Sequence, residues 1–73
     1  MRFRQDIPDL MISLPSFQDF DHGKEIDETV PIEWNLLPKD KIYWYCGQFY
    51  GIAEIVKFEV VDGLCLCTVK KVS

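Results

Sequence analysis

The stretch KIYWYCGQFYGIAEIV, from Lys41 to Val56, decides the fold of this chain and holds five of its ten aromatic residues. Its first six residues alternate between an apolar set and a tyrosine set, namely Ile42, Trp44 and Cys46 against Tyr43 and Tyr45. Successive side chains of a strand point to opposite faces, so this alternation predicts a strand with one buried face. A Gly-Gln pair then predicts a tight turn, and the apolar run that follows it predicts a second strand.

A second turn follows this stretch. Asp62-Gly63 is the strongest short-range hairpin signal in the chain, because both central residues of a type I′ turn need positive φ. The run LCLCTVKKV after it predicts a last strand, with Cys65, Cys67 and Val69 on one face and Leu64, Leu66 and Thr68 on the other. The second half of the chain is therefore expected to form three consecutive antiparallel strands.

The long middle strand changes its apolar face along its length. One parity holds Phe49, Ala53 and Ile55, and the other holds Val56, Phe58 and Val60. Such a change predicts a bulge or a sharp bend, which lets one strand serve both halves of a small curved barrel while Gly51 relieves crowding. In this order of strands and turns, the last half of the chain is similar in pattern to SH3-like small barrels. An open three-stranded meander fits the same pattern.

The first half of the chain carries weaker signals. LMISLP predicts a short edge strand ended by Pro15, and TVPIEW, with Pro31 inside it, predicts an edge strand or a strand entry. SFQDFDHG places Ser16 as an N-cap, Asp19 in the capping-box position and Gly23 as a stop. Such a segment forms one or two helical turns with Phe17 and Phe20 packed on the sheet, or an irregular loop.

The expected fold is mainly β: a small curved antiparallel sheet or SH3-like barrel with a short N-terminal helix or loop, or alternatively an open α+β meander. A hydrophobic content of 48% is enough for a folded chain, and 73 residues are expected to make a single domain, residues 1–73. The N-terminus does not read as a signal peptide, and LMISL is too short to span a membrane. The cytoplasm is therefore the expected location, with no membrane contact.

Charge is distributed unevenly. Nine carboxylates and two lysines lie between Asp6 and Asp40, and the whole chain has a formal net charge of −4. This excess argues against direct binding to nucleic-acid phosphates, where cationic side chains gain by releasing counterions. The acidic residues either keep a small protein soluble or imitate phosphates in the cationic groove of an enzyme. The candidate residues for such mimicry are Asp19, Asp21, Glu25, Asp27 and Glu28.

No pattern in the chain predicts a cofactor, a metal site or an enzyme. The three cysteines, Cys46, Cys65 and Cys67, are expected to be buried thiols, since a C-x-C spacing on a strand is not a zinc-knuckle turn and His22 lies in a distant loop. A calcium loop counted from Asp19 would place Lys24 where glycine is required and Val30 where the bidentate acid is required. Nucleophile-elbow, phosphate-loop and metalloprotease patterns are missing from the sequence.

Tyr43, Tyr45 and Tyr50 form the second candidate site, because they face outward if Trp44 faces inward. Tyrosine combines an apolar ring with a polar hydroxyl and loses little rotamer entropy on binding, which favours a contact with a protein partner. The sequence thus predicts a small non-catalytic protein-binding module, an adaptor or inhibitor of a larger protein. The alternative is an acidic nucleic-acid mimic of phage or mobile-element type. Two alternatives in which the tyrosines are buried also stay open. The rings cover the faces of a small sheet within one molecule, or they are buried between the two copies of a homodimer.

Overall fold

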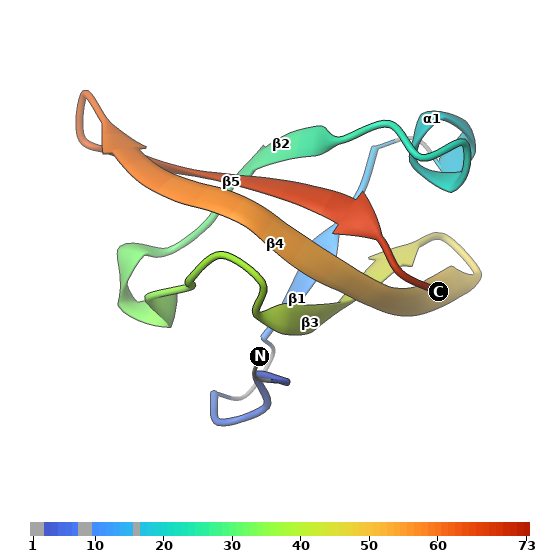
Figure 1. Ribbon diagram of the computed structural model, residues 1–73, viewed down its shortest axis with the longest axis horizontal. Coiled ribbons are helices and arrows are strands. Elements are labelled where there is room, and N and C mark those ends of the chain that lie inside the picture. Colours follow the sequence, from blue (N-terminus) through green and yellow to red (C-terminus); the bar gives the residue numbers. More distant parts are fainter. Residues whose placement is uncertain (1–2, 8–9, 16) are drawn as a thin grey trace.

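The chain folds into one five-stranded sheet that curls through 217° into a half-barrel, as the computed structural model shows (Figure 1). The structure describes residues 3–7, 10–15 and 17–73. The strands are β1 (Met11–Ser13), β2 (Ile26–Thr29), β3 (Lys41–Cys46), β4 (Phe49–Val61) and β5 (Leu64–Lys71), and the helices are α1 (Phe17–Asp21) and the 3-10 helix η1 (Ile32–Trp34). Their order in the sheet is β1-β3-β4-β5-β2. The mainly β prediction, with a small curved sheet and a short helix, is confirmed.

The three consecutive antiparallel strands form as the alternation predicted. The β3–β4 turn lies at Gly47-Gln48, and Tyr45 and Tyr50 face each other across this hairpin. In the β4–β5 turn both central residues have positive φ, 52° for Asp62 and 79° for Gly63, as a type I′ turn needs. The two turns thus fix the register of the central meander.

The parity change in β4 is a β-bulge. Ile55 pairs with Val69 and Lys57 pairs with Thr68, so Val56 is the extra residue on the bulged strand. The bulge lets Ala53 and Ile55 point into the concave face before it, and half-buried Phe58 after it. The predicted bend is confirmed. It allows the single strand β4 to line both parts of the half-barrel.

The two edge strands have features that the alternation of apolar and polar residues did not predict. β1, inside the predicted LMISLP segment, pairs with β3 in parallel, so the sheet is mixed. β2 pairs antiparallel with β5 and comes from a segment for which no strand was expected. The prediction of a strand over TVPIEW is wrong: only Thr29 belongs to a strand, and η1 follows. Val30 donates its amide to the carbonyl of Cys65, and β5 begins only one residue earlier, at Leu64, so β5 offers no further partner beyond this bond.

The segment after β1 forms the short helix and not the irregular loop. Ser16, the expected N-cap, lies outside the described residues, and so does the side chain of Phe17. Gly23 has φ 88° just beyond α1, as the predicted stop requires. Phe20 is fully buried and meets Trp44 edge to face, with ring centroids 5.1 Å apart. This contact fastens α1 to the concave face of the sheet.

The core fills the concave face. Trp44, Ile42, Ile55 and Val69 are almost fully buried, and Leu36 reaches them from the loop after η1. The indole Nε1 of Trp44 donates to the carbonyl oxygen of Ser73, 3.0 Å away. Among the described residues, no helix has the length and apolar character needed to cross a membrane.

Candidate protein-interaction surface

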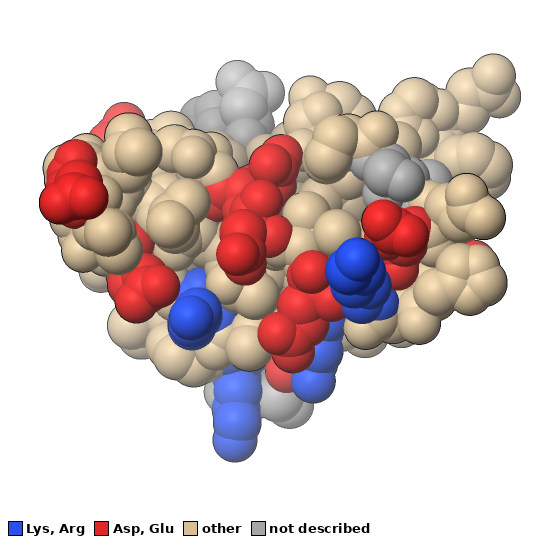
Figure 2. All heavy atoms as spheres, turned by 90° about the horizontal axis from the view of Figure 1, so that it is seen from above, with Lys and Arg blue, Asp and Glu red and all other residues tan. Residues whose placement is uncertain are grey.

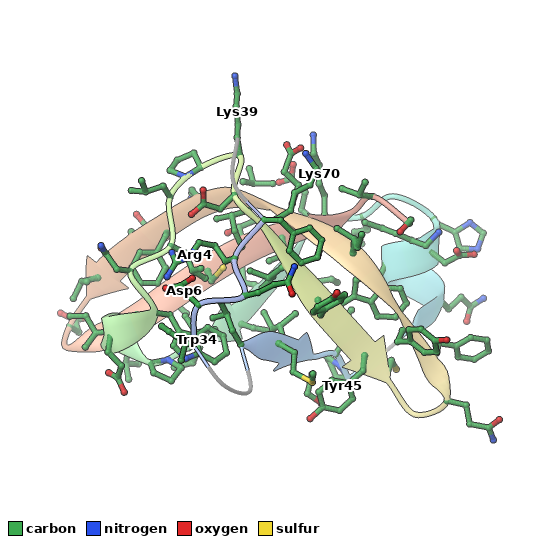
Figure 3. All side chains as sticks on the ribbon, turned by 90° about the horizontal axis from the view of Figure 1, so that it is seen from below. Arg4, Asp6, Trp34, Lys39, Tyr45 and Lys70 are labelled. Carbon is green, nitrogen blue, oxygen red and sulfur yellow. The ribbon has the colours of Figure 1, made fainter. Side chains whose placement is uncertain are left out.

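The three tyrosines singled out by their spacing lie together on the convex face of the sheet. Tyr43 and Tyr45 are each 41% exposed and Tyr50 is 81% exposed, whereas Trp44 between the first two is 2% exposed. Tyr45 stands directly opposite Tyr50, and Tyr43 stands opposite Ile52. Directly opposite residues of an antiparallel pair have Cβ atoms about 5 Å apart, so the three rings form one patch. Tyr45 points away from the sheet in Figure 3.

Two residues from the N-terminal segment enlarge this patch. Met11 pairs with Tyr43 in the parallel β1–β3 ladder and is 42% exposed. Phe3 packs on Tyr43 edge to face, with ring centroids 4.9 Å apart. We call the whole set the aromatic face; its members are Phe3, Met11, Tyr43, Tyr45, Tyr50 and Ile52. Sequence reasoning missed Phe3 and Met11, because only the long-range parallel pairing brings them beside β3.

A buried arginine holds the N-terminal segment in place. The backbone N–H of Arg4 donates to the Lys41 carbonyl at 2.8 Å, and its guanidinium donates to the carbonyls of Trp34 (2.8 Å) and Asn35 (3.1 Å). It also pairs with buried Asp40, at 3.6 Å between nitrogen and oxygen. Through these contacts the side chain of Arg4 connects the N-terminal segment, residues 3–7, to the loop after η1 (Figure 3). Its neighbour Phe3 is thereby kept on Tyr43.

Asp6 completes the arginine site. Its two carboxylate oxygens accept from Nε and an Nη of Arg4, at 2.7 and 3.1 Å. This hydrogen bond raises the pKa of Arg4 above its ordinary value, against the opposing effect of burial. The guanidinium is therefore charged at neutral pH. No sequence pattern pointed to this site, since Arg4 and Asp40 meet only in the folded chain.

Charged residues border the aromatic face at the far end of its strands. Lys41 and Glu54 are paired across β3 and β4, and Glu54 forms an ion pair with Lys70 of β5 at 3.5 Å. An apolar centre with a polar margin is the usual composition of a protein–protein interface. Rings at the centre can anchor a partner, while the charges at the margin remain hydrated.

The acidic candidate residues do not gather into one cluster. Asp19 and Asp21 lie on α1, and Asp21 pairs with Lys71 at 3.2 Å. On β2, Asp27 accepts a hydrogen bond from Thr68 at 2.6 Å, while Glu28 belongs to the opposite face of that strand and Glu25 is exposed just before it. Figure 2 views the molecule from above, relative to Figure 1, and shows Lys and Arg side chains among the Asp and Glu side chains of that surface. Nearby cations thus offset part of the negative charge.

The thiols are placed as small hydrophobic side chains. Cys65 and Cys67 are buried on the concave side, as predicted, and Cys46 is half-buried at the end of β3. Burial raises the pKa of Cys67 to about 12, and the negative charge of Asp27 adds to the effect. His22 is exposed beyond α1. Over residues 3–7, 10–15 and 17–73, no three His, Cys, Asp or Glu side chains are grouped closely enough to hold a metal ion.

Comparison with known proteins adds no family to this description. No family model matches the chain, and no curated protein or solved structure matches it significantly. A functional assignment therefore starts from the geometry of the aromatic face.

Proposed function

We propose that this protein is a small non-catalytic protein-binding module that acts as an adaptor or inhibitor of a larger protein through its aromatic face. The observation that carries the proposal is the exposure of Tyr43, Tyr45 and Tyr50 side by side on one face. The chain has ten aromatic residues, and five of those that the structure describes are exposed outside the core: Phe3, Tyr43, Tyr45, Phe49 and Tyr50. Contiguous exposed apolar surface of this kind marks interaction sites.

The chemistry of the face suits a protein partner. Tyrosine rings supply rigid contact area, and their hydroxyls seek hydrogen-bond acceptors, which a partner's backbone carbonyls provide. The β3–β4 hairpin holds the rings on a hydrogen-bonded scaffold, so little entropy is lost when a partner binds. Single-strand nucleic-acid sites also stack on rings but need a basic groove, and the margin here mixes Lys41 and Lys70 with Glu54. Protein is therefore the proposed partner class.

The thiols support a non-catalytic role in a reducing compartment. The raised pKa keeps Cys67 protonated and poorly nucleophilic at neutral pH, and a thiol acts as a nucleophile only as the thiolate. Cys46, Cys65 and Cys67 are all free. Free thiols persist where glutathione and thioredoxin keep them reduced, which favours the cytoplasm as the proposed location.

The test is a pull-down from lysate followed by titration of the purified partner. Tyr45→Ala with Tyr50→Ala removes both rings of one cross-strand pair, and we expect affinity for the partner to fall at least about tenfold, as when interface rings are truncated. The matched control is Asp19→Lys with Glu25→Lys, two exposed positions away from the aromatic face. This control is expected to bind like the wild type at both low and high salt. Circular dichroism establishes that each variant is folded.

The opposite pattern would support the acidic mimic. In that case the charge-reversed variant loses the partner, binding weakens steeply with salt, and the tyrosine variant still binds. Binding by both variants would also contradict the proposal, because it would place the contact on neither surface.

A further inference from the structure

The distal half of β4 has a strand on only one side. β3 pairs with β4 no further than Lys41 opposite Glu54, and the backbone of Ile55 is still bonded to Lys39 and Asp40. From Lys57 to Val61, β4 pairs with β5 alone within the part of the chain that is described. Figure 1 shows the β4–β5 hairpin, in orange, extending beyond the rest of the sheet. The opposite edge of this segment is open.

The hairpin geometry identifies the backbone groups on the open edge. Val61 and Leu64 flank the two-residue turn and pair with each other, so the polar groups of Val61 point toward β5. Because these groups alternate along a strand, the N–H and C=O of Phe58 and Val60 point away from β5. In the described residues no other segment pairs with Phe58 or Val60. A strand with such an edge readily accepts another strand.

The sequence at this edge is complementary to itself. Residues 56–60 read VKFEV, with Phe58 at the centre, a lysine before it and a glutamate after it. Lys57 and Glu59 are both exposed on the same face, with 3.6 Å between amine and carboxylate. If two such segments pair antiparallel about Phe58, each Lys57 stands opposite Glu59 of the second copy. Charged residues at an open edge usually prevent another strand from pairing with it. Here the opposite charges favour pairing with the same edge of a second copy.

We propose that the open edge of β4 pairs with the same edge of a second copy, in a two-fold antiparallel arrangement centred on Phe58. The N–H and C=O of Phe58 then bond to those of Phe58 in the second copy. Val60, which is 56% exposed, comes to lie opposite Val56 of that copy. A register shifted to centre on Glu59 would place two carboxylates face to face, which is unfavourable. The charges therefore select the register.

This interface is separate from the aromatic face. Tyr50 and Phe58 are eight residues apart along β4, a length of about 26 Å at the usual rise per residue. The pairing therefore leaves both aromatic faces open and gives the dimer two of them. Two linked sites on a repeated or symmetric target bind more tightly than one. The pairing does not depend on the proposed function, because it is tested on the isolated protein.

Sedimentation of the purified protein tests the pairing by charge reversal. We expect wild type to shift from monomer to dimer between about 10 µM and about 1 mM, because so small an interface gives weak association. Lys57→Glu or Glu59→Lys alone places like charges opposite each other twice, and each is expected to weaken dimerisation about tenfold or more. The double swap, Lys57→Glu with Glu59→Lys, restores opposite charges and is expected to restore the dimer. Glu25→Lys, the control for net charge, is expected to dimerise like wild type.

Amide hydrogen exchange then checks the register. The amide of Phe58 is expected to exchange at least about fivefold more slowly at the high concentration than at the low one, while that of Glu59, already turned toward β5, does not change. A wild type that stays monomeric throughout the range would overturn the proposal. A dimer equally strong in both single variants, or a double swap that fails to restore it, would overturn it as well.

Discussion

The two faces of β3 show how differently neighbouring rings are used in one small protein. Trp44 is 2% exposed on the concave face, and Tyr43 and Tyr45, one position to either side, are 41% exposed on the convex face. The concave face is closed by Phe20 of α1 and by Leu36. On the convex face, within the part of the chain that is described, Phe3 and Met11 lie beside Tyr43 and cover the face in part. Aromatic content is therefore no measure of core size, since burial depends on which face of the strand the other segments of the chain cover.

The largest effect is expected from removing the central ring of the concave face. Trp44→Ala deletes a buried indole and its hydrogen bond to Ser73, and leaves a cavity beside Phe20. We expect a loss of about 3–5 kcal/mol in the free energy of unfolding, measured by urea denaturation followed by circular dichroism. A loss below about 1 kcal/mol would contradict the assignment of Trp44 to the core.

The next largest effect is expected from removing the ion pair between Arg4 and Asp40. Arg4→Met leaves the buried Asp40 carboxylate without its guanidinium, and removing one partner of a buried ion pair costs roughly 3 kcal/mol or more. The same variant frees the segment that places Phe3 on Tyr43, so the ring contact of Phe3 should also weaken in nuclear Overhauser spectra. Arg4→Lys, which keeps the charge but not the fork of donors, is expected to lose less stability. Equal stability of wild type and Arg4→Met would disprove this role.

A smaller effect is expected at Gly51, where the backbone of β4 packs closely against Ser73 at the C-terminal end of the chain. A Cβ at Gly51 would overlap the Ser73 carbonyl and lie 3.0 Å from Nε1 of Trp44. Gly51→Ala is therefore expected to lose about 1–3 kcal/mol of stability through overpacking. Deletion of Val72 and Ser73 supplies the control. In that shortened background the same substitution should lose clearly less, and an unchanged loss would place the cause elsewhere.

The pH dependence of stability gives a further test of the concave face. Because burial holds the pKa of Cys67 at about 12, the folded protein keeps a proton that the unfolded chain releases near its ordinary pKa of 9.0. Stability from this group is complete below about pH 9 and falls as the pH rises toward 12. Between pH 8 and pH 10, wild type should lose more stability than Cys67→Ala. Parallel curves would show that the thiol is not shielded.

The smallest effect on stability belongs to the convex face. Tyr45→Ala alters an exposed ring on the same strand as Trp44, and we expect the free energy of unfolding to change by less than about 1 kcal/mol. The same urea titration as for Trp44→Ala provides the measurement. A loss as large as that of Trp44→Ala would mean that the tyrosine is buried, for example within a dimer, and would move the aromatic face from the surface to the interior.

Local patterns predicted the central meander well. The alternation in KIYWYC, the Asp62-Gly63 turn and the parity change around Val56 are each set by residues close in sequence. They fixed three strands, their register and the bulge, and they placed Tyr43, Tyr45 and Tyr50 on one side. In the first half, the short strand β1 was also anticipated, and the helix α1 was one of the two alternatives left open for its segment.

The remaining features depend on contacts between distant segments. β2 carries only half-buried and exposed residues, so its sequence IDET has little strand signal until β5 offers an edge to pair with. TVPIEW carried the alternation of a strand, yet η1 forms there because β5, the partner strand of β2, begins at Leu64 and offers no further edge to pair with beyond Val30. Phe3 was not anticipated as part of the candidate site, because it reaches Tyr43 through its long-range parallel bridge to Lys41 of β3.

By itself, the amino-acid sequence determined which side chains share a face of each central strand and where the chain turns, because those properties follow from a period of two and from positive φ at Asp62 and Gly63. Only the tertiary structure decided which face became the core. Burial requires a covering segment, and α1, the loop after η1 and the N-terminal segment took their places through the Phe20 and Arg4 contacts. The same decision left three tyrosines and the distal edge of β4 exposed to other molecules.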